Sequence, residues 1–240
     1  MLLRTILPEH HVSDESKDVV KLGIGMIATM AALVLGLLIA SAKGSFDTAS
    51  SGLRQAGSRI ILLDRVMAHY GPETMKARDL LRRVIASSIA RSWPEDKVEL
   101  SLAKAGEGRV DIEAVQDQLR QLSPRNDAQR WLWSRALQIS GDIAENRWLL
   151  IEQMGQSSIP MPFLVILVFW LTVIFATFGL FSPRNATVIV VLLVCALSAA
   201  GSLFLILELD NPYGGLIKVS SAPLRNALAH LGQVDPKPLP

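Results

Sequence analysis

The sequence contains little cysteine, few aromatic residues and little charge. Cys195 is the only cysteine in 240 residues, so no disulfide bond can form within the chain. Aromatic residues make up 6% and charged residues 19% of the sequence, whereas 50% is hydrophobic. Soluble domains carry about 25% charged residues. The low charge, with a mean hydropathy of +0.34, indicates a membrane protein.

The sequence also lacks an excess of either sign of charge and lacks the common catalytic motifs. With 24 basic and 22 acidic residues, the chain has no strong field to attract nucleic acid. It contains no Gly-rich phosphate loop, no metal-binding pattern of histidine and carboxylate on a helix, and no nucleophile elbow. We therefore expect no nucleic-acid partner, no catalytic residues, no metal, no cofactor and no enzymatic activity.

Three long stretches without charge are present. Lys21 and Lys43 enclose 21 uncharged residues, Glu152 and Arg184 enclose 31, and Arg184 and Glu208 enclose 23. A helix needs about 20 apolar residues to cross the hydrocarbon core of a bilayer. We predict transmembrane helices at 19–43, 160–182 and 187–209, so that the lipid bilayer is the first partner of this chain.

The remaining segments are polar or amphipathic. Residues 1–18 read as an N-terminal tail or loop, 44–158 as a helical module, and 210–240 as a C-terminal tail. From Leu53 to Tyr70 apolar residues recur at three and four, which predicts that the first membrane helix continues beyond the bilayer. Gly71 and Pro72 end it and begin a second helix that runs to about Trp93.

A further long helix is predicted at 126–157, with Ser123 or Asn126 as its N-cap. Its tryptophans at 131, 133 and 148 are expected to be core and interface anchors of the module. The predicted fold class is all-α: a multi-span helical membrane protein whose long helices extend into a cytoplasmic helical module.

The orientation follows from the odd number of membrane helices. The N-terminal tail and the Arg184 loop share one side, and the module and C-terminal tail share the other. Six Lys and Arg residues lie close to the membrane on the module side and four on the other side. Since positive residues tend to remain cytoplasmic, we expect the module in the cytoplasm and the chain in the cell inner membrane.

The first membrane helix carries small residues at intervals of four: Ala28, Ala32, Gly36, Ala40 and Gly44. A ridge of small side chains lets another helix approach closely, which is how helices associate in lipid. Three uses of this helix-packing ridge remain open: packing against the other membrane helices of the same chain, self-association, or a position around a pore axis.

No ionisable residue lies in the middle of a membrane helix, although proton-driven transporters usually need one. Small hydroxyl residues do occur there: Thr29, Ser41, Thr172 and Thr177. They either line a channel or bond to the carbonyl groups of their own helices.

Polar and turn-forming residues follow the last membrane helix. Asp210 is expected to cap the backbone of the turn, Pro212 to fix φ, and Gly214 or Gly215 to adopt a positive φ. We predict that Asp210, Pro212 and Gly215 form a structural hinge. The apolar residues after it are expected to pack on the module or the bilayer surface: Leu216, Val219, Leu224 and Leu228.

A carboxylate at a helix C-terminus faces the negative end of the helix dipole and needs a partner. The candidates for Glu208 and Asp210 are Arg54, Arg59 and Arg147.

Three stretches carry a resemblance to a known family: "LELDNPYGGLIKVSSAPLRNAL", "LLDRVMAHYGPETMKARDLLRR" and "LPEHHVSDESKDVVKLGIGMIATMAALVLGLLIASAKGSFD". The sequence resembles a bacterial membrane-protein family of unknown function that is described as bestrophin-like. The similarity covers nearly the whole chain, and the Asp-x-Pro-x-x-Gly stretch at 210–215 is its most specific part. Relatives carry one more N-terminal membrane helix. "MLLR" looks like its last turn, so we expect a start site assigned too late.

The resemblance to bestrophins implies a homo-oligomeric channel for small anions, with an acidic calcium-binding clasp after the last membrane helix. Glu208, Asp210 and Asn211 are similar in position to that clasp and form a candidate cation site. Two carboxylates and one amide fall short of the six to eight oxygens that calcium prefers.

The alternative function is a non-conducting membrane scaffold or sensor whose cytoplasmic helical module binds a protein partner. An exposed apolar patch on the Trp131 and Trp148 face would favour this alternative. A continuous axial path lined by the ridge from Ala28 to Gly44 would favour the channel.

Overall fold

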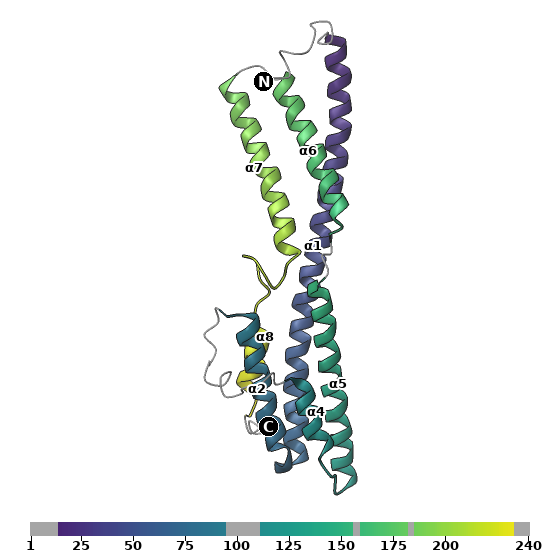
Figure 1. Ribbon diagram of the computed structural model, residues 1–240, viewed down its shortest axis with the longest axis vertical. Helices are drawn as coiled ribbons and strands as arrows, with labels where there is room; N and C mark the ends of the chain where they lie inside the picture. Colours follow the sequence, from purple (N-terminus) through teal and green to yellow (C-terminus); the bar gives the residue numbers. More distant parts are fainter. Residues whose placement is uncertain (1–13, 95–110, 156–158, 182–184, 233–240) are drawn as a thin grey trace, which may run out of the picture. The chain divides into compact units, whose positions relative to one another are not determined.

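The structure is a computed structural model that describes residues 14–94, 111–155, 159–181 and 185–232. Within these ranges every regular element is a helix, which confirms the all-α prediction (Figure 1). The elements are α1 (Asp14–Tyr70), the 3₁₀ helix η3 (Pro72–Thr74), α2 (Met75–Ser92), α4 (Ile112–Arg120), α5 (Asp127–Gly155), α6 (Met161–Phe181), α7 (Ala186–Leu209) and α8 (Ala222–His230). The proposed last turn of an earlier helix, at "MLLR", lies outside the described residues.

The described residues form two units. The membrane unit contains α1 as far as Phe46, α6, α7 and the turn that ends at Ile217, and the helical module contains the rest of α1 with α2, α4, α5 and α8. The sequence-based division of the chain, with a module at 44–158 and a tail at 210–240, therefore needs one correction. The end of the tail belongs to the module, because α8 packs against α2.

Among the described residues, three helices are long and apolar enough to cross a membrane: α1 within Asp18–Tyr70, α6 and α7. Their apolar stretches coincide with the spans predicted at 19–43, 160–182 and 187–209. Asn185 begins α7, since its Oδ1 accepts a hydrogen bond of 3.3 Å from the amide of Thr187.

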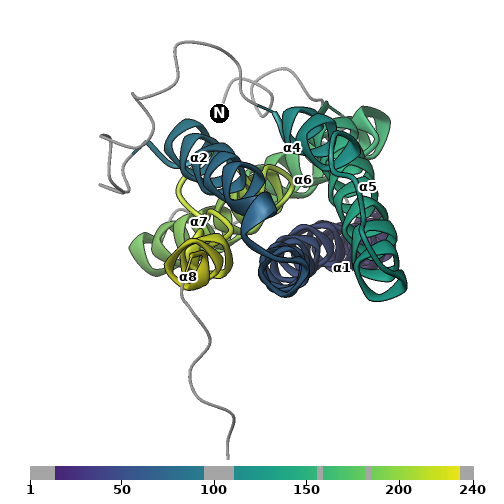
Figure 2. The ribbon, with the colours of Figure 1, turned by 90° about the horizontal axis from the view of Figure 1, so that it is seen from below.

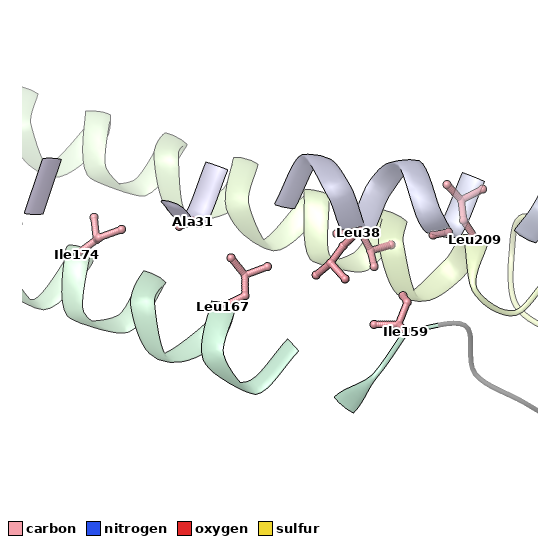
Figure 3. Packing of buried hydrophobic residues seen from close by; sticks show 8 residues of the cluster. Ala31, Leu38, Ile159, Leu167, Ile174 and Leu209 are labelled. Atoms are coloured by element: carbon pink, nitrogen blue, oxygen red, sulfur yellow. The ribbon is translucent and has the colours of Figure 1, made fainter. Parts of the chain in front are cut away.

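The three helices of the membrane unit share one apolar core (Figure 3). In that core Leu38 of α1, Leu167 and Ile174 of α6, and Leu209 of α7 are buried. Other large apolar side chains of the unit remain exposed, among them Leu22, Leu33, Phe169, Val190 and Leu197. This distribution suits helices that face lipid on their outer sides.

In the helical module α2 packs against α4 and α8, and α4 packs against α5; Figure 2 shows α4 beside α5. The buried side chains recur at helical spacing, such as Ile60, Leu63 and Met67 on α1. α1, α2 and α4 thus bury apolar side chains in this core, as the sequence pattern predicts.

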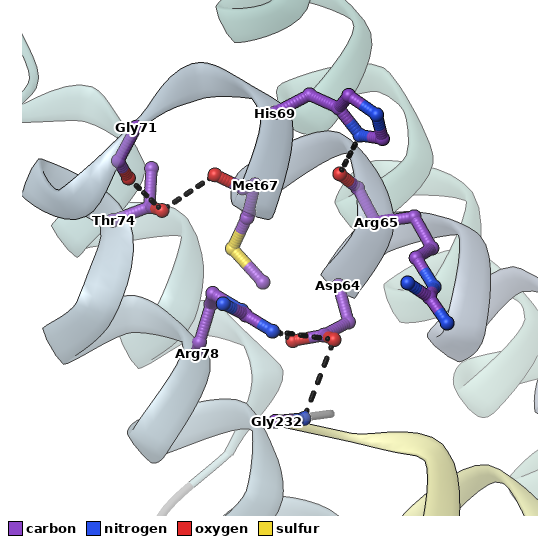
Figure 4. Close-up of polar contacts among 8 residues, drawn as sticks. All are labelled: Asp64, Arg65, Met67, His69, Gly71, Thr74, Arg78 and Gly232. Atoms are coloured by element: carbon purple, nitrogen blue, oxygen red, sulfur yellow. Dashed lines mark hydrogen bonds and ion pairs between the residues drawn. The ribbon is translucent and has the colours of Figure 1, made fainter. Parts of the chain in front are cut away.

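The connection between α1 and α2 is held by side chains of both helices (Figure 4). Gly71 has φ of 135°, and Thr74 Oγ1 donates to the carbonyl oxygens of Met67 at 2.6 Å and Gly71 at 2.8 Å. Arg78 donates two hydrogen bonds, at 2.7 and 2.9 Å, to the carboxylate of Asp64. The predicted break at Gly71 and Pro72 is confirmed, with one 3₁₀ turn ahead of α2.

Asp64 is only 2% exposed, and its hydrogen bond with Arg78 raises the pKa of the guanidinium further above its usual value. The same carboxylate also accepts a hydrogen bond of 3.4 Å from the backbone amide of Gly232. A buried charge pair of this kind keeps α1, α2 and the end of α8 in a fixed arrangement, because each charge needs the other.

The segment after the turn packs on the module as predicted, with one exception. Val219, Leu224 and Leu228 are buried, but Leu216 is 84% exposed. Trp93 Nε1 donates to the carbonyl oxygen of Val219 at 2.9 Å. Leu216 differs because it belongs to the turn itself. Its backbone amide donates to Glu208 Oε1, while its side chain stays exposed.

Candidate functional site

The small residues of α1 do not pack within the chain as a ridge. Ala28 is half-buried beside the core, but Ala32, Gly36, Ala40 and Gly44 are exposed. A Cβ atom added to Gly36 or Gly44 would meet no atom within 4 Å. Packing against the chain's own membrane helices, one of the three uses left open by the sequence, is therefore wrong for most of the ridge.

The geometry of the helix explains this result. Because an α-helix has 3.6 residues per turn, residues spaced by four drift around it by about 40° at each step. The ridge starts beside the buried face at Ala28 and winds away from it. The α1 residues in the core are Ala31, Leu38 and Ala42, whose intervals of seven and four keep them on one side.

A straight exposed face of α1 is formed by small residues at successive intervals of four, three, four and four. We call Gly25, Thr29, Ala32, Gly36 and Ala40 the small-residue face; all five are exposed. Thr29 Oγ1 donates to the carbonyl oxygen of Gly25 at 2.8 Å. Thr172 and Thr177 likewise bond to carbonyl groups of α6, both at 2.7 Å. These hydroxyl groups thus bond to carbonyl groups of their own helices, and they add no charge.

Charged residues follow the small-residue face along α1. Lys43 is exposed, and its Nζ lies 5.7 Å from the centre of the Phe46 ring. Asp47 and Arg54 are exposed further along the helix. These three residues carry a net charge of one positive unit at the end of the apolar stretch.

The turn after α7 is organised by Glu208. Its Oε1 accepts a hydrogen bond from the amide of Leu216 and another, of 2.9 Å, from the amide of Ile217. Gly215 has φ of 80°, and a Cβ atom there would collide with the Glu208 carboxylate. The predicted positive φ is confirmed at Gly215, where both the backbone conformation and the close approach require glycine.

A second side chain also bonds to the turn backbone. Asn211 Oδ1 accepts a hydrogen bond of 3.1 Å from the amide of Gly214. Asp210 ends α7, with its own amide donating to the carbonyl oxygen of Ile206 at 3.1 Å, and its role as a cap of the turn stays a prediction. The hinge role of Asp210, Pro212 and Gly215 stays a prediction.

The same contacts bear on the candidate cation site of Glu208, Asp210 and Asn211. Glu208 Oε1 and Asn211 Oδ1 face backbone N–H groups, which carry partial positive charge and repel a cation. Nowhere in the described part of the chain do three His, Cys, Asp or Glu side chains come together as a metal would need. Glu208, Asp210 and Asn211 of one chain do not by themselves supply the six to eight oxygens that calcium binds, and a calcium site at this turn stays a prediction.

Two of the three arginines expected beside these carboxylates, Arg59 and Arg147, make other contacts. Arg147 pairs with Asp111 at 3.0 Å and with Glu113 at 3.5 Å. Arg59 donates to the carbonyl oxygen of Asp142 at 3.4 Å. These bonds connect the helices of the module. In the turn, burial raises the pKa of the Tyr213 hydroxyl, so this group stays neutral at physiological pH.

The tryptophans of α5 divide into two kinds. Trp133 is partly buried and donates through Nε1 to the carbonyl oxygen of Leu119 at 2.7 Å. Trp131 is 66% exposed and Trp148 is 59% exposed. The predicted core anchor is confirmed for Trp133. Trp131 and Trp148 are not core residues and leave apolar surface uncovered on the module, and their role as interface anchors stays a prediction.

Known structures with a similar fold are bacterial bestrophin homologues from Klebsiella pneumoniae. One, solved by Zn-SAD phasing, has a TM-score of 0.65 and 14% identity over 89% of this chain and 88% of that chain. A point mutant has a TM-score of 0.62 and 13% identity, over 87% and 86% of the two chains. Identities this low show the fold alone. A search among curated proteins found no matching relative.

The family is shown by the sequence itself. The model of the bestrophin-like domain matches residues 1–224, which is nearly the whole chain and includes α1, α6, α7 and the turn held by Glu208. This match confirms the resemblance drawn from the three quoted stretches. The chain belongs to the bestrophin-like family.

Proposed function

We propose that this chain forms a homo-oligomeric channel for small anions in the cell inner membrane, with the small-residue face of α1 lining the path. The observation that carries the proposal is the exposure of Gly25, Thr29, Ala32, Gly36 and Ala40 on a helix that buries a different side in its own core.

The composition of the small-residue face suits the lining of a narrow path better than contact with lipid. Large apolar side chains, such as Leu33 and Leu37, are exposed on a neighbouring side of α1 and fit the acyl chains. Glycine and alanine bury little apolar area in lipid, whereas in a ring of helices they leave room along the axis. Channels can be lined by apolar groups, hydroxyl groups and backbone without intramembrane charge.

The charged residues at the end of the small-residue face indicate the sign of the conducted ion. Lys43, Asp47 and Arg54 together carry one positive charge per subunit, and a ring of subunits repeats that charge around the axis. A positive potential concentrates anions at the mouth of a path. Anion conduction is also what the resemblance to bestrophins implies.

The orientation is part of the proposal. Lys and Arg residues near the membrane are more numerous on the module side, and this excess supports a cytoplasmic module. The path then continues from the bilayer along α1, which is one unbroken helix from Asp14 to Tyr70.

Cysteine accessibility tests the lining directly. In a Cys195→Ser background, needed because Cys195 is exposed, Gly36→Cys is compared with Leu37→Cys in liposomes. These adjacent residues point about 100° apart on the helix. A thiol must ionise in water to react. An anionic methanethiosulfonate should therefore modify position 36 much faster than position 37. Equal rates would contradict the lining role.

One observation favours the second candidate function, a scaffold or sensor whose module binds a protein. Trp131 and Trp148 are exposed on the same helix of the module. Exposed aromatic residues are typical of docking surfaces. The two functions are compatible in one molecule, because the small-residue face and the α5 tryptophans lie on different helices.

A further inference from the structure

The exposed charged residues of α2 are mainly basic: Lys76, Asp79, Arg82, Arg83 and Arg91. The half-buried Arg78 on the same helix pairs with Asp64. In the part of the chain that the structure describes, no hydrogen bond or ion pair holds the guanidinium of Arg83 or Arg91. These two arginines therefore expose positive charge that nothing described in the chain neutralises.

The second half of α5 has the opposite character. Glu145 and Glu152 are exposed there, and so are Trp148 and Leu149 between them. At 100° per residue the four side chains spread over about 100° of the helix circumference. We call them the acidic face of α5. Apolar side chains flanked by charge are typical of a surface that another protein covers.

The basic side chains of α2 and the acidic face of α5 lie apart in one chain. α4 packs against both helices and lies between them, as Figure 2 shows. In a ring of identical copies, one surface of each copy contacts a different surface of the next. A basic surface and an acidic surface on different helices of the same chain meet this requirement.

α2 and α5 run in the same direction through the module. Gln129, near the start of α5, donates to the carbonyl oxygen of Tyr70 at 3.1 Å. Further along α5, the carbonyl oxygen of Asp142 accepts from Arg59 at 3.4 Å, so α5 runs back along α1. α2 also runs back along α1, because the chain reverses at Gly71. Both helices therefore start at the Tyr70 end of the module.

The charges of the two helices also match in position along the module. Since Arg78 is level with its ion-pair partner on α1, Arg83 lies about 16 Å and Arg91 about 28 Å from the Tyr70 end, at 1.5 Å per residue. By the same rise Glu145 lies about 21 Å and Glu152 about 31 Å from that end. The offsets, about 5 Å and about 3 Å by this rise, are shorter than an arginine side chain.

The surface of α2 between the two arginines has room for an aromatic ring. Ser87 and Ala90 lie there, and both are small and half-buried. Trp148 is exposed between the two glutamates of α5, at a height between those of Arg83 and Arg91. A guanidinium over the face of an indole ring gains a cation–π interaction.

We propose that Arg83 and Arg91 of α2 bind the acidic face of α5 in the next copy of this chain. In this contact Glu145 faces Arg83, Glu152 faces Arg91, and Trp148 packs over the small residues between the arginines. The inference rests on the proposed homo-oligomer and names the surfaces through which its helical modules assemble.

Crosslinking tests the contact in the full chain. In a Cys195→Ser background, the double variant Arg83→Cys and Glu145→Cys is treated with a short bismaleimide in liposomes. We expect a ladder of covalent oligomers from the double variant only, because the contact joins two different surfaces. No ladder from the double variant, or covalent dimers from either single-cysteine variant, would contradict the contact.

Charge reversal gives a second readout, with native mass spectrometry of the full chain in detergent. The variant Arg83→Glu and Arg91→Glu places like charges opposite each other, so it should raise the concentration at which the oligomer dissociates by about tenfold or more. Adding Glu145→Arg and Glu152→Arg should restore the oligomer. Failure of this exchange to restore it, or an oligomer that the first reversal leaves unchanged, would overturn the proposal.

Matched controls lie on the same two helices. Arg82→Glu reverses an exposed charge that points about 100° away from Arg83, and Asp127→Arg reverses one at the start of α5. Both should leave the oligomer unchanged, and an equal loss in them would count against the contact.

The outcomes separate this contact from conduction. An oligomer that conducts chloride but ignores the reversals at Arg83 and Arg91 contradicts the contact and leaves the channel in place. A wild-type chain that is monomeric contradicts both. If Arg83→Glu lowers the amount of anionic lipid bound to the purified protein while the oligomer mass stays the same, the basic side chains of α2 bind lipid and the contact is wrong.

Discussion

At the scale of residues, Gly215 combines two constraints, a positive φ and a close approach of another side chain. Its φ of 80° lies in the region that favours glycine. The Glu208 carboxylate also occupies the space of a Cβ atom. Gly232 has the same φ of 80°, but a Cβ atom there would meet nothing within 4 Å.

A comparison of Gly215 with Gly232 separates the free-energy cost of backbone strain from the cost of a steric clash with Glu208. Gly232→Ala should lower stability by roughly 1 kcal/mol, the lower end of the usual cost of such a conformation. Gly215→Ala should lose more, about 3 kcal/mol, because Glu208 must also leave its amide partners. Thermal unfolding of both variants in detergent measures the difference. Equal melting temperatures would contradict the close contact with Glu208.

At the scale of elements, α8 depends on its approach to α1. A Cβ atom on Gly57 would lie 2.8 Å from the carbonyl oxygen of Pro223, which is backbone and cannot rotate away. Gly57 is therefore a point where α8 approaches α1 closely. The contact connects the segment that follows the turn to the module.

Gly57→Ala should destabilise the module by about 1–3 kcal/mol, as overpacking usually does, and should speed amide exchange in α8. Gly141, in α5, has open space around its missing Cβ atom. Gly141→Ala should stabilise its helix by up to about 1 kcal/mol, from helix propensity alone. The melting temperature should therefore fall in Gly57→Ala and rise in Gly141→Ala. Amide hydrogen exchange should become faster in the first variant and slower in the second. Stabilisation in both would refute the contact.

The elements themselves were largely predictable from the sequence. Missing charges define the membrane helices, and local signals mark helix ends, such as Asn126, whose Oδ1 accepts from the amide of Gln129 at 2.8 Å. These features act over a few residues, so periodicity and capping rules detect them.

The faces of the helices were harder to predict. Small residues spaced by four suggested one ridge. Because the helix has 3.6 residues per turn, most residues of this ridge lie away from the buried side of α1. Trp131 and Trp133 differ by two positions, about 200° around the helix, so one is exposed and the other bonds to Leu119. Which side of a helix is buried depends on neighbours that the local pattern does not contain.

The candidate site was also only partly predictable. The turn, its positive φ and its importance followed from Asp210, Pro212 and Gly215. Glu208 and Asn211 act on the turn backbone because of the path that the loop takes. Nothing in the order of Glu208, Asp210 and Asn211 reveals which oxygens meet the amides of residues 214 to 217.

At the scale of the whole molecule, the account depends on assembly. In a single chain the small-residue face of α1 is exposed over the residues that the structure describes. Copies related by rotation about the membrane normal would bring these faces together around an axis. The exposed face can therefore line a path only in an oligomer. The proposal of conduction thus requires the proposal of assembly.

The most direct measurement is chloride flux through liposomes that contain the purified full chain, compared between wild type and Gly36→Leu. The bulky side chain should abolish flux, while native mass spectrometry finds the same oligomer in both. Gly23→Leu is the control, since Gly23 also has open space but lies about 140° away around α1. It should conduct normally. Unchanged flux in Gly36→Leu, or no flux from a folded wild-type oligomer, would contradict an anion path along α1.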